Sequence, residues 1–172
     1  PEVCDGIDQD CDGSADAGVI GGGADCPAID CQEIIDDNPS SQSGTYTLES
    51  SSYGIFDAYC DMDADGGGWT LVGSIVNEGN RNWNGLGVWT DSTTFGSLST
   101  RQNADFKSPA FAHITGEDVL IRTAEYAIAF NSIIPDTDFG LYIDNEYNAN
   151  TCSTSFIQSG ADWVENLNTA QR

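Results

Sequence analysis

The pattern of apolar and polar positions divides the chain into two parts. Residues 1–26 have no hydrophobic periodicity and consist mostly of Asp, Gly and Cys, so they cannot bury a core of their own. From residue 27 onward, apolar runs of strand length alternate with turn signals. We therefore predict a module at 1–26 and a folded domain at 27–172, with a flexible joint at 21–25.

Within the second part, the pattern predicts one short helix followed by strands. Asp30 and Glu33 have the spacing of a capping box, and an apolar face begins directly after them. Alternation and β-branched or aromatic content predict strands at 44–49, 55–62 and 68–76, and a strand pair or one long bent strand at 119–130. Residues 77–97 form a long Gly- and Asn-rich connection, and irregular segments of this length are usually functional or held by ligands.

The charge balance limits the choice of partner. The chain has 28 Asp and Glu against 5 Lys and Arg, a formal net charge of −23, and its first basic residue is Arg81. Such a chain is repelled by nucleic acid and anionic membranes and attracts cations, so we expect neither nucleic-acid binding nor membrane insertion. No stretch reaches the ~18 apolar residues of a membrane helix. Because the chain starts at Pro1 without a Met, we expect a processed product or a fragment of an exported protein.

Six cysteines indicate disulfide bonds and an oxidising compartment. An even count in a Gly-, Ser- and Asn-rich chain is typical of exported proteins, so we expect an extracellular or cell-surface location. Zinc is the competing interpretation, but the chain has no C-x2-C pair and His113 is its single histidine. The cysteines are Cys4, Cys11, Cys26, Cys31, Cys60 and Cys152.

The amino-terminal part contains a D-x-D-x-D-G pattern that is typical of calcium loops. Alternate carboxylates converge on one oxygen-seeking ion, and the Gly13 that follows permits a sharp turn. The twelfth position is Val19, so the bidentate Glu of an EF-hand is missing and we predict a bare calcium loop. A merely solvated acidic run is the alternative, but its carboxylates would repel one another. The expected ligands are Asp8, Asp10, Asp12, Ser14 through its carbonyl, and Asp16.

The segment PEVCDGIDQDCDGSADAG also resembles the MopE-type acidic cysteine repeat. That resemblance covers about 19 residues and implies a small cysteine-stapled, metal-binding spacer of secreted and surface proteins of bacteria. The residues that it brings are Cys4, Asp5, Asp8, Asp10, Cys11 and Asp12.

The segments DCQEIIDDNPSSQSGTYTLES and YCDMDADGGGWTLV resemble the fibrinogen-related domain in its bacterial and intelectin-like form. The resemblance implies an α+β fold, with a short helix, a small mixed or antiparallel sheet and long irregular loops. It also implies a bond between Cys31 and Cys60, which closes a loop worth roughly 3–4 kcal/mol on the chain-entropy model. We expect Gly66 to Gly68 to turn the backbone tightly before Trp69 enters the core. A phosphate-binding glycine loop would instead need a following helix and usually a Lys.

More distant matches extend the resemblance toward calcium sites. VWTDSTTFGSLSTRQNADFKSPAFAHI is similar to an intelectin segment, which implies Asn77, Glu78 and Asp105 as calcium ligands and calcium-mediated sugar binding. FGLYIDNEYNANTCS is similar to the fibrinogen calcium loop and implies Asp144 and Glu146 as ligands, although a polar turn explains it equally well. The family's domain normally exceeds 200 residues, so the resemblance leads us to expect that this domain of about 140 is truncated or reduced. Cys152 pairs with Cys26 or with another chain.

We expect a protein that is not an enzyme. The sequence has one histidine and no G-x-S-x-G elbow, and its cysteines are assigned to disulfides. No catalytic constellation remains. The predicted function is a calcium-dependent carbohydrate-binding or adhesion module of a bacterial surface or secreted protein, with glycans or cell-surface components as partners. The alternative is a self-associating structural subunit or spacer of an extracellular fibre or surface layer. Copper is disfavoured because hard oxygen ligands dominate.

Overall fold

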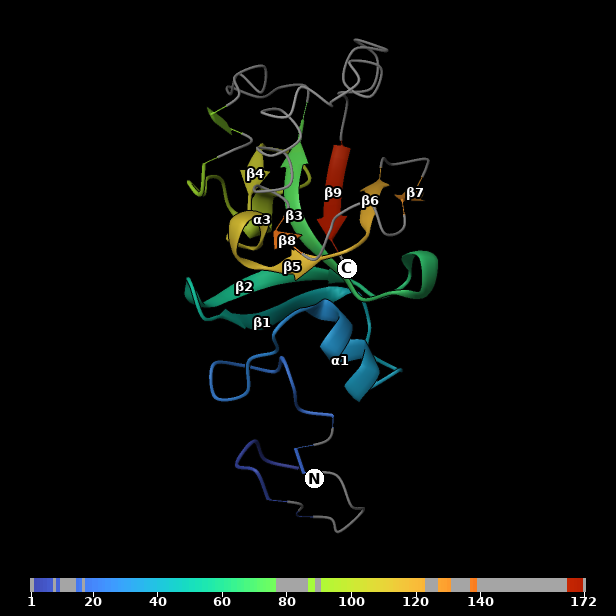
Figure 1. Ribbon diagram of the computed structural model, residues 1–172. Helices are drawn as coiled ribbons and strands as arrows, with labels where there is room; N and C mark the ends of the chain where they lie inside the picture. The colour runs from blue at the N-terminus through green and yellow to red at the C-terminus, as the bar shows by residue number, and fades with distance from the viewer. Residues whose placement is uncertain are drawn as a thin grey trace. The chain divides into compact units, whose positions relative to one another are not determined.

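The computed structural model describes residues 2–7, 9, 15–16, 18–76, 87–88 and 91–122, and in addition the backbone of 127–130, 137–138 and 167–171. The chain divides into two compact units, Pro1–Thr70 and Leu71–Gln171. Figure 1 labels helices and strands of both units.

The first unit contains one short helix and an antiparallel hairpin. Its elements are α1 (Cys31–Asp37), β1 (Gly44–Ser50), β2 (Gly54–Asp61), the 3₁₀ turn η1 (Ala64–Gly66) and the start of β3 (Trp69–Ile75). β1 and β2 pair from Gly44↔Cys60 to Ser50↔Gly54, and the first two residues of β3 pair with the end of β2. The predicted helix and the first three predicted strands are therefore confirmed.

The core of this unit lies between α1 and the hairpin. The hairpin residues that reach the core are Leu48, Ala58 and Cys60, as expected where one face of a hairpin is covered. The cluster consists of Ala28, Cys31, Ile34, Leu48, Ala58, Cys60 and Met62, with Ile20, Ile35, Tyr46 and Phe56 packed against it.

Helix α1 begins with the predicted cap and is tied to the sheet at its first residue. Asp30 Oδ1 accepts a hydrogen bond from Glu33 N at 2.8 Å. The reciprocal bond goes from Ile29 N to Glu33 Oε2, one residue earlier than in the standard capping box. Cys31 N donates to Thr70 Oγ1 at 3.1 Å, and the buried Cys31 sulfur is bonded to Cys60. This is the pair that the fibrinogen resemblance implies.

The three glycines before Trp69 all have positive φ. The values are 89° at Gly66, 83° at Gly67 and 78° at Gly68. Gly67 also has ψ −171°, a region that is essentially closed to other residues. A Cβ on Gly67 would lie 2.5 Å from Met62 O, and one on Gly68 would meet the Gln32 side chain of α1. The glycines thus act through backbone conformation and close packing, as predicted, and Trp69 follows them into the core with no exposed surface.

The segment predicted as a flexible joint is instead a hydrogen-bonded turn on the outer edge of β1. Gly21 N donates to Cys26 O at 2.7 Å, and Gly21 O accepts from Thr47 N of β1 at 2.9 Å. Ala28 then continues along the same edge through bonds with Thr47 O and Glu49 N. The composition suggested a linker because glycines are common in linkers, but here Gly21 lies directly against Ile34 and Tyr46. The division at residues 26 and 27 stays a prediction.

The second unit is built from short strands around the rest of β3. Its elements are η2 (Leu98–Thr100), β4 (Phe106–Lys107), α3 (Ala110–His113), β5 (Thr115–Gly116), β6 (Val119–Arg122), β7 (Ala127–Phe130), β8 (Thr137–Asp138) and β9 (Leu167–Gln171). The strand order is β3-β9-β6-β7, with β4 also paired to β3 and with β5 paired to β8. In Figure 1 the red β9 therefore stands between β3 and β6, although it comes last in the chain.

The ladders with a defined register are antiparallel: β1–β2, β2–β3, β3–β4, β5–β8, β6–β7 and β6–β9. The run at 119–130 is a strand pair rather than one bent strand, because Val119↔Phe130 to Arg122↔Ala127 form a hairpin. The α+β class with a short helix and an antiparallel sheet is confirmed. In the described part of the chain, no helix is long and apolar enough to cross a membrane.

The glycine turn yields a direct stability test. Gly67→Ala is expected to lower the free energy of unfolding by about 2–5 kcal/mol, because it adds backbone strain and a clash with Met62 O. Gly23→Ala is the matched control, since a Cβ there meets nothing within 4 Å. Urea unfolding of the two variants measures the difference. A Gly67→Ala protein as stable as Gly23→Ala would show that the turn is not fixed by these contacts.

Candidate functional site

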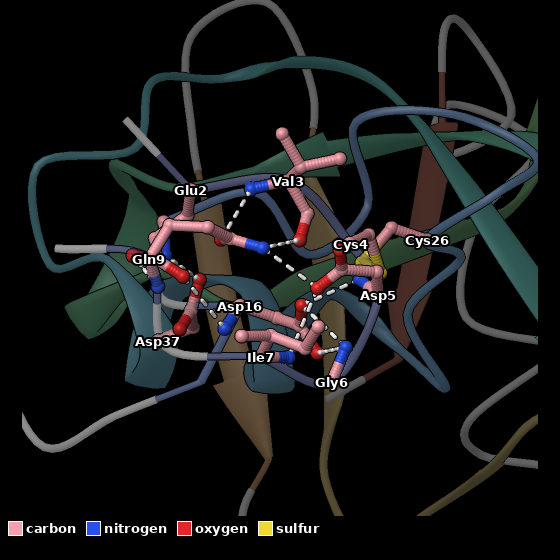
Figure 2. The surroundings of a disulfide bond; sticks show 11 residues. Glu2, Val3, Cys4, Asp5, Gly6, Ile7, Gln9, Asp16, Cys26 and Asp37 are labelled. Carbon is pink, nitrogen blue, oxygen red and sulfur yellow. Dashed lines mark hydrogen bonds between the residues drawn. A yellow bond between two sulfur atoms is a disulfide. The ribbon is translucent and has the colours of Figure 1, made fainter. Parts of the chain in front are cut away.

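In the acidic amino-terminal module, carboxylates bind backbone N–H groups (Figure 2). Asp16 accepts from Asp5 N at 2.8 Å and from Gly6 N at 3.0 Å, and it has a positive φ of 60°. Glu2 bridges Gln9 N at 3.1 Å and Asp16 N at 3.2 Å with its two oxygens. Because backbone N–H groups carry partial positive charge, they offset the repulsion between carboxylates in a segment that has no basic residues.

Asp5 is part of the same network. Its Oδ1 accepts from Ile7 N at 3.0 Å and from Gln9 Nε2 at 2.7 Å. The sequence predicts Asp5 and Asp16 near a metal ion, whereas no motif in it points to Glu2. The signal available for Glu2 was its place in the PEVCDG stretch, where an acid precedes the first cysteine.

A disulfide closes this module from Cys4 to Cys26, with the two Cα atoms 5.5 Å apart. Cys26 is therefore bonded to Cys4 and not to Cys152. Of the two partners predicted for Cys152, Cys26 is thus wrong. The correct partner was hard to predict because spacing alone does not select among three neighbouring cysteines. Cys11 and Cys152 lie outside the described residues.

Most of the expected calcium ligands also lie outside the described part of the chain. These residues are Asp8, Asp10, Asp12, Ser14, Asn77, Glu78, Asp144 and Glu146. Among the residues that are described, no group of three or more His, Cys, Asp or Glu side chains could hold a metal ion. The described ligand candidates are thus Asp5, Asp16 and Asp105.

Asp105 is a buried carboxylate with one oxygen that has no partner. It is 9% exposed and directly precedes β4. Its Oδ1 accepts from Val76 N at 3.0 Å, at the end of β3. Oδ2 is buried and has no hydrogen-bond partner among the described residues. A buried carboxylate oxygen without a donor is costly, so a cation beside it would stabilise the fold.

The spacing D-x-D-x-D-G occurs a second time, at residues 61–66, which the sequence analysis did not single out. There the Oδ1 of the buried Asp61 accepts from Asp63 N and Ala64 N, both at 3.1 Å. Asp63 Oδ2 accepts from Ser43 Oγ at 2.6 Å. In addition, Trp69 Nε1 donates to Ala64 O at 2.7 Å. In this turn, Asp61 holds backbone N–H groups in place. The D-x-D-x-D-G pattern alone therefore does not establish a metal site.

Lys107, the single lysine of the chain, is 1% exposed and lies beside Val88 and Asp91. Its Nζ donates to Val88 O at 2.8 Å, to Asp91 O and to Asp91 Oδ1 at 2.9 Å, so all three ammonium protons have acceptors. It also lies 4.3 Å from the centre of the Phe111 ring. The sequence pattern around Lys107 does not predict this structural role.

These features define an α+β domain with a buried disulfide between its helix and its hairpin. The family model of the fibrinogen beta and gamma chains, C-terminal globular domain, matches residues 28–117, which is more than half of the chain. The chain therefore belongs to the fibrinogen C-terminal domain family. Domains of this class are often extracellular, in agreement with the two disulfides of the described residues.

Relatives and solved structures match shorter stretches. The chain is 34% identical over 83 residues to the human (Homo sapiens) fibrinogen alpha chain and 32% identical over 80 residues to the rat (Rattus norvegicus) fibrinogen alpha chain. These alignments cover 46% and 45% of this chain but only 9% and 10% of those proteins.

Two fibrinogen-like globe domains are among the similar solved structures. That of human ANGPTL6 is 22% identical with a TM-score of 0.38, over 55% of this chain and 41% of that one. That of human ANGPTL2 is 19% identical with a TM-score of 0.41, over 60% of this chain and 49% of that one.

The Lys107–Asp91 pair predicts a specific pH dependence of stability. The hydrogen bond from Lys107 holds the pKa of Asp91 below its ordinary value of 3.8, against the opposing effect of partial burial. Because the folded-state pKa is the lower one, the ionised pair stabilises the fold above about pH 4 and loses this effect as the pH falls through the depressed pKa.

Asp91→Asn is therefore expected to be less stable than the parent at pH 7, with the gap closing below about pH 4. Thermal unfolding from pH 7 to pH 3 measures this gap. Glu117→Gln, an exposed acid of the same unit, serves as the control. A gap for Asp91→Asn that stays constant across this range would contradict the assignment.

Proposed function

We propose that this chain is a non-catalytic, calcium-binding extracellular module of a bacterial surface or secreted protein. It recognises carbohydrate or other cell-surface components. The observation that carries the calcium part is the buried Oδ2 of Asp105, which has no hydrogen-bond partner among the described residues. Within a chain of net charge −23, a hard cation is the partner that best satisfies a buried carboxylate.

Asp105 meets the chemical requirement for a calcium ligand but does not make a site alone. Calcium takes six to eight oxygen ligands, which include backbone and amide carbonyls as well as carboxylates. In the proposal, Asn77 and Glu78 supply further oxygens, since they directly follow Val76 in the sequence. Such an ion would add charge compensation next to the start of β4 and so stabilise this end of the sheet.

The amino-terminal module is the second proposed calcium site. Asp8, Asp10, Asp12 and the Ser14 carbonyl are its direct ligands in this proposal, and Asp16, whose carboxylate already accepts from Asp5 N and Gly6 N, acts at the ninth position through a bridging water. The contacts of Glu2 and Asp16 support it, because they tie backbone N–H groups before and after residues 10–14. A third site at Asp144 and Glu146 rests on the sequence alone.

Calcium titration of chelator-stripped protein, by calorimetry and thermal unfolding together, tests these sites. We expect at least two sites and a calcium-dependent rise in melting temperature. The triple variant Asp8→Asn, Asp10→Asn, Asp12→Asn should lose one site. Asp105→Asn should lose another, while its melting temperature without metal stays equal or rises, because the change removes a buried carboxylate oxygen that has no partner among the described residues.

Asp57→Asn, which changes an exposed acid of the hairpin, is the matched control and should keep every site. If Asp105 is only structural, Asp105→Asn will lower stability equally with and without calcium. Absence of binding heat in the parent protein would reject the calcium proposal as a whole.

Carbohydrate recognition has its own test. Glycan-array binding should be selective and should disappear in EDTA, because the ion is proposed to take part in the recognition. Binding that survives chelation would separate recognition from calcium. If no glycan binds while calcium drives concentration-dependent assembly, the alternative role as a fibre or surface-layer subunit would replace this one.

A further inference from the structure

We propose that the first unit carries a docking groove for a basic segment of a partner protein, in which an apolar side chain is flanked by Lys or Arg. The groove is a hollow of about 600 Å³, within the range of ligand-binding cavities in proteins. It lies where the amino-terminal module meets α1 and β1, and all its lining residues belong to the first unit.

The walls of the groove are mainly apolar. They are formed by Val3, Val19, Ile20, Ile34 and Tyr46, together with the Cys4–Cys26 disulfide that is drawn in Figure 2. Val3 is 61% exposed, so a large aliphatic side chain stands at the rim in contact with water. Covering this surface would remove apolar area from water, which favours an apolar side chain in the groove.

The charged residues of the groove favour a partner peptide in which a basic residue stands next to the apolar side chain. Asp25 and Asp37 also line it. Asp37 accepts a hydrogen bond from Gly18 N at 2.7 Å, whereas the exposed Asp25 has no ion pair or hydrogen bond with any described residue. The sequence of residues 1–70 contains sixteen Asp and Glu and no Lys, Arg or His, so this stretch of the chain supplies no basic side chain to place beside Asp25.

The same charge disfavours the other occupants. An acidic peptide, a nucleic acid or an anionic lipid surface would be repelled by the field of sixteen carboxylates. A second copy of this unit carries the same charge and is repelled as well. A basic, partly apolar peptide gains both from the field and from the apolar walls, and this combination fits the residues of the groove.

The test is a titration of the isotope-labelled full chain, followed by NMR, with the peptide acetyl-Lys-Leu-Lys-amide as the probe. It is done in calcium and again in EDTA, so that its result does not depend on whether the proposed calcium sites exist. Amide shift changes should centre on Val19, Ile20 and Tyr46, and the affinity should fall as salt is raised. Acetyl-Lys-Ser-Lys-amide and acetyl-Glu-Leu-Glu-amide should each bind at least threefold more weakly.

Two matched pairs of variants separate the groove from the general charge of the unit. Asp25→Asn should weaken binding at least threefold, and Asp57→Asn, an equal charge change outside the groove, should not. Val3→Thr should weaken it similarly, and Ile55→Thr, an exposed aliphatic residue on β2, should not.

The proposal is overturned if no shifts occur at millimolar peptide or if Asp57→Asn weakens binding as much as Asp25→Asn. It is also overturned if the Glu-Leu-Glu peptide binds as well as the basic one, because the groove would then accept apolar groups without regard to charge.

Discussion

The attachment of the first turn of α1 to the sheet is the constraint on which the first unit depends. Three contacts act within a few residues: the Cys31–Cys60 disulfide, the bond from Cys31 N to Thr70 Oγ1, and the contact of Gln32 with the backbone of Gly68. The helix is only seven residues long, and a helix of this length is not stable alone. These contacts replace helix propensity and set how closely α1 approaches the strands.

This close approach explains the sequence around it. A side chain at Gly67 or Gly68 would occupy the space of Met62 O or Gln32, so glycine is required on the sheet side. With the helix held at this distance, Ile34 reaches Leu48 and Ala58 in the core. The other edge of the hairpin is the outer side of β1. Residues 21–28 cover it and give β1 a backbone partner along much of this side.

The two units compensate negative charge in different ways. Residues 1–70 of the first unit include no Lys, Arg or His. Carboxylates in this stretch accept hydrogen bonds from backbone N–H groups, and the accepting residues are Asp5, Asp16, Asp30, Asp37 and Asp61. The second buries Lys107 against Asp91 and backbone carbonyls. Backbone N–H groups offset repulsion locally but leave the net charge unchanged. A unit built in this way remains attractive to cations and to basic peptides.

The parts of the fold that could be predicted from the sequence are those that depend on local chemistry. The Asp30 cap, the alternation of β1 and β2 and the three glycines each express a constraint between residues that are near in sequence. The position of β9 between β3 and β6 could not be predicted, because strand order depends on long-range pairing rather than on pattern. The turn at 21–25 was missed for a similar reason, since its partner is Thr47.

The candidate site was less predictable than the fold because the spacing of acidic residues in a sequence does not determine which atoms their carboxylate oxygens contact. Asp61 and Asp105 are both buried acids, 4% and 9% exposed, and of the two it is Asp61 that lies in the D-x-D-x-D-G spacing typical of calcium loops. Their contacts nevertheless favour Asp105 as a ligand, since Asp61 Oδ1 holds two N–H groups in a turn whereas Asp105 Oδ2 has none among the described residues. A cation at Asp61 would have to replace existing hydrogen bonds, but at Asp105 it would meet an unsatisfied oxygen. Competition between backbone donors and the ion therefore separates a structural acid from a ligand.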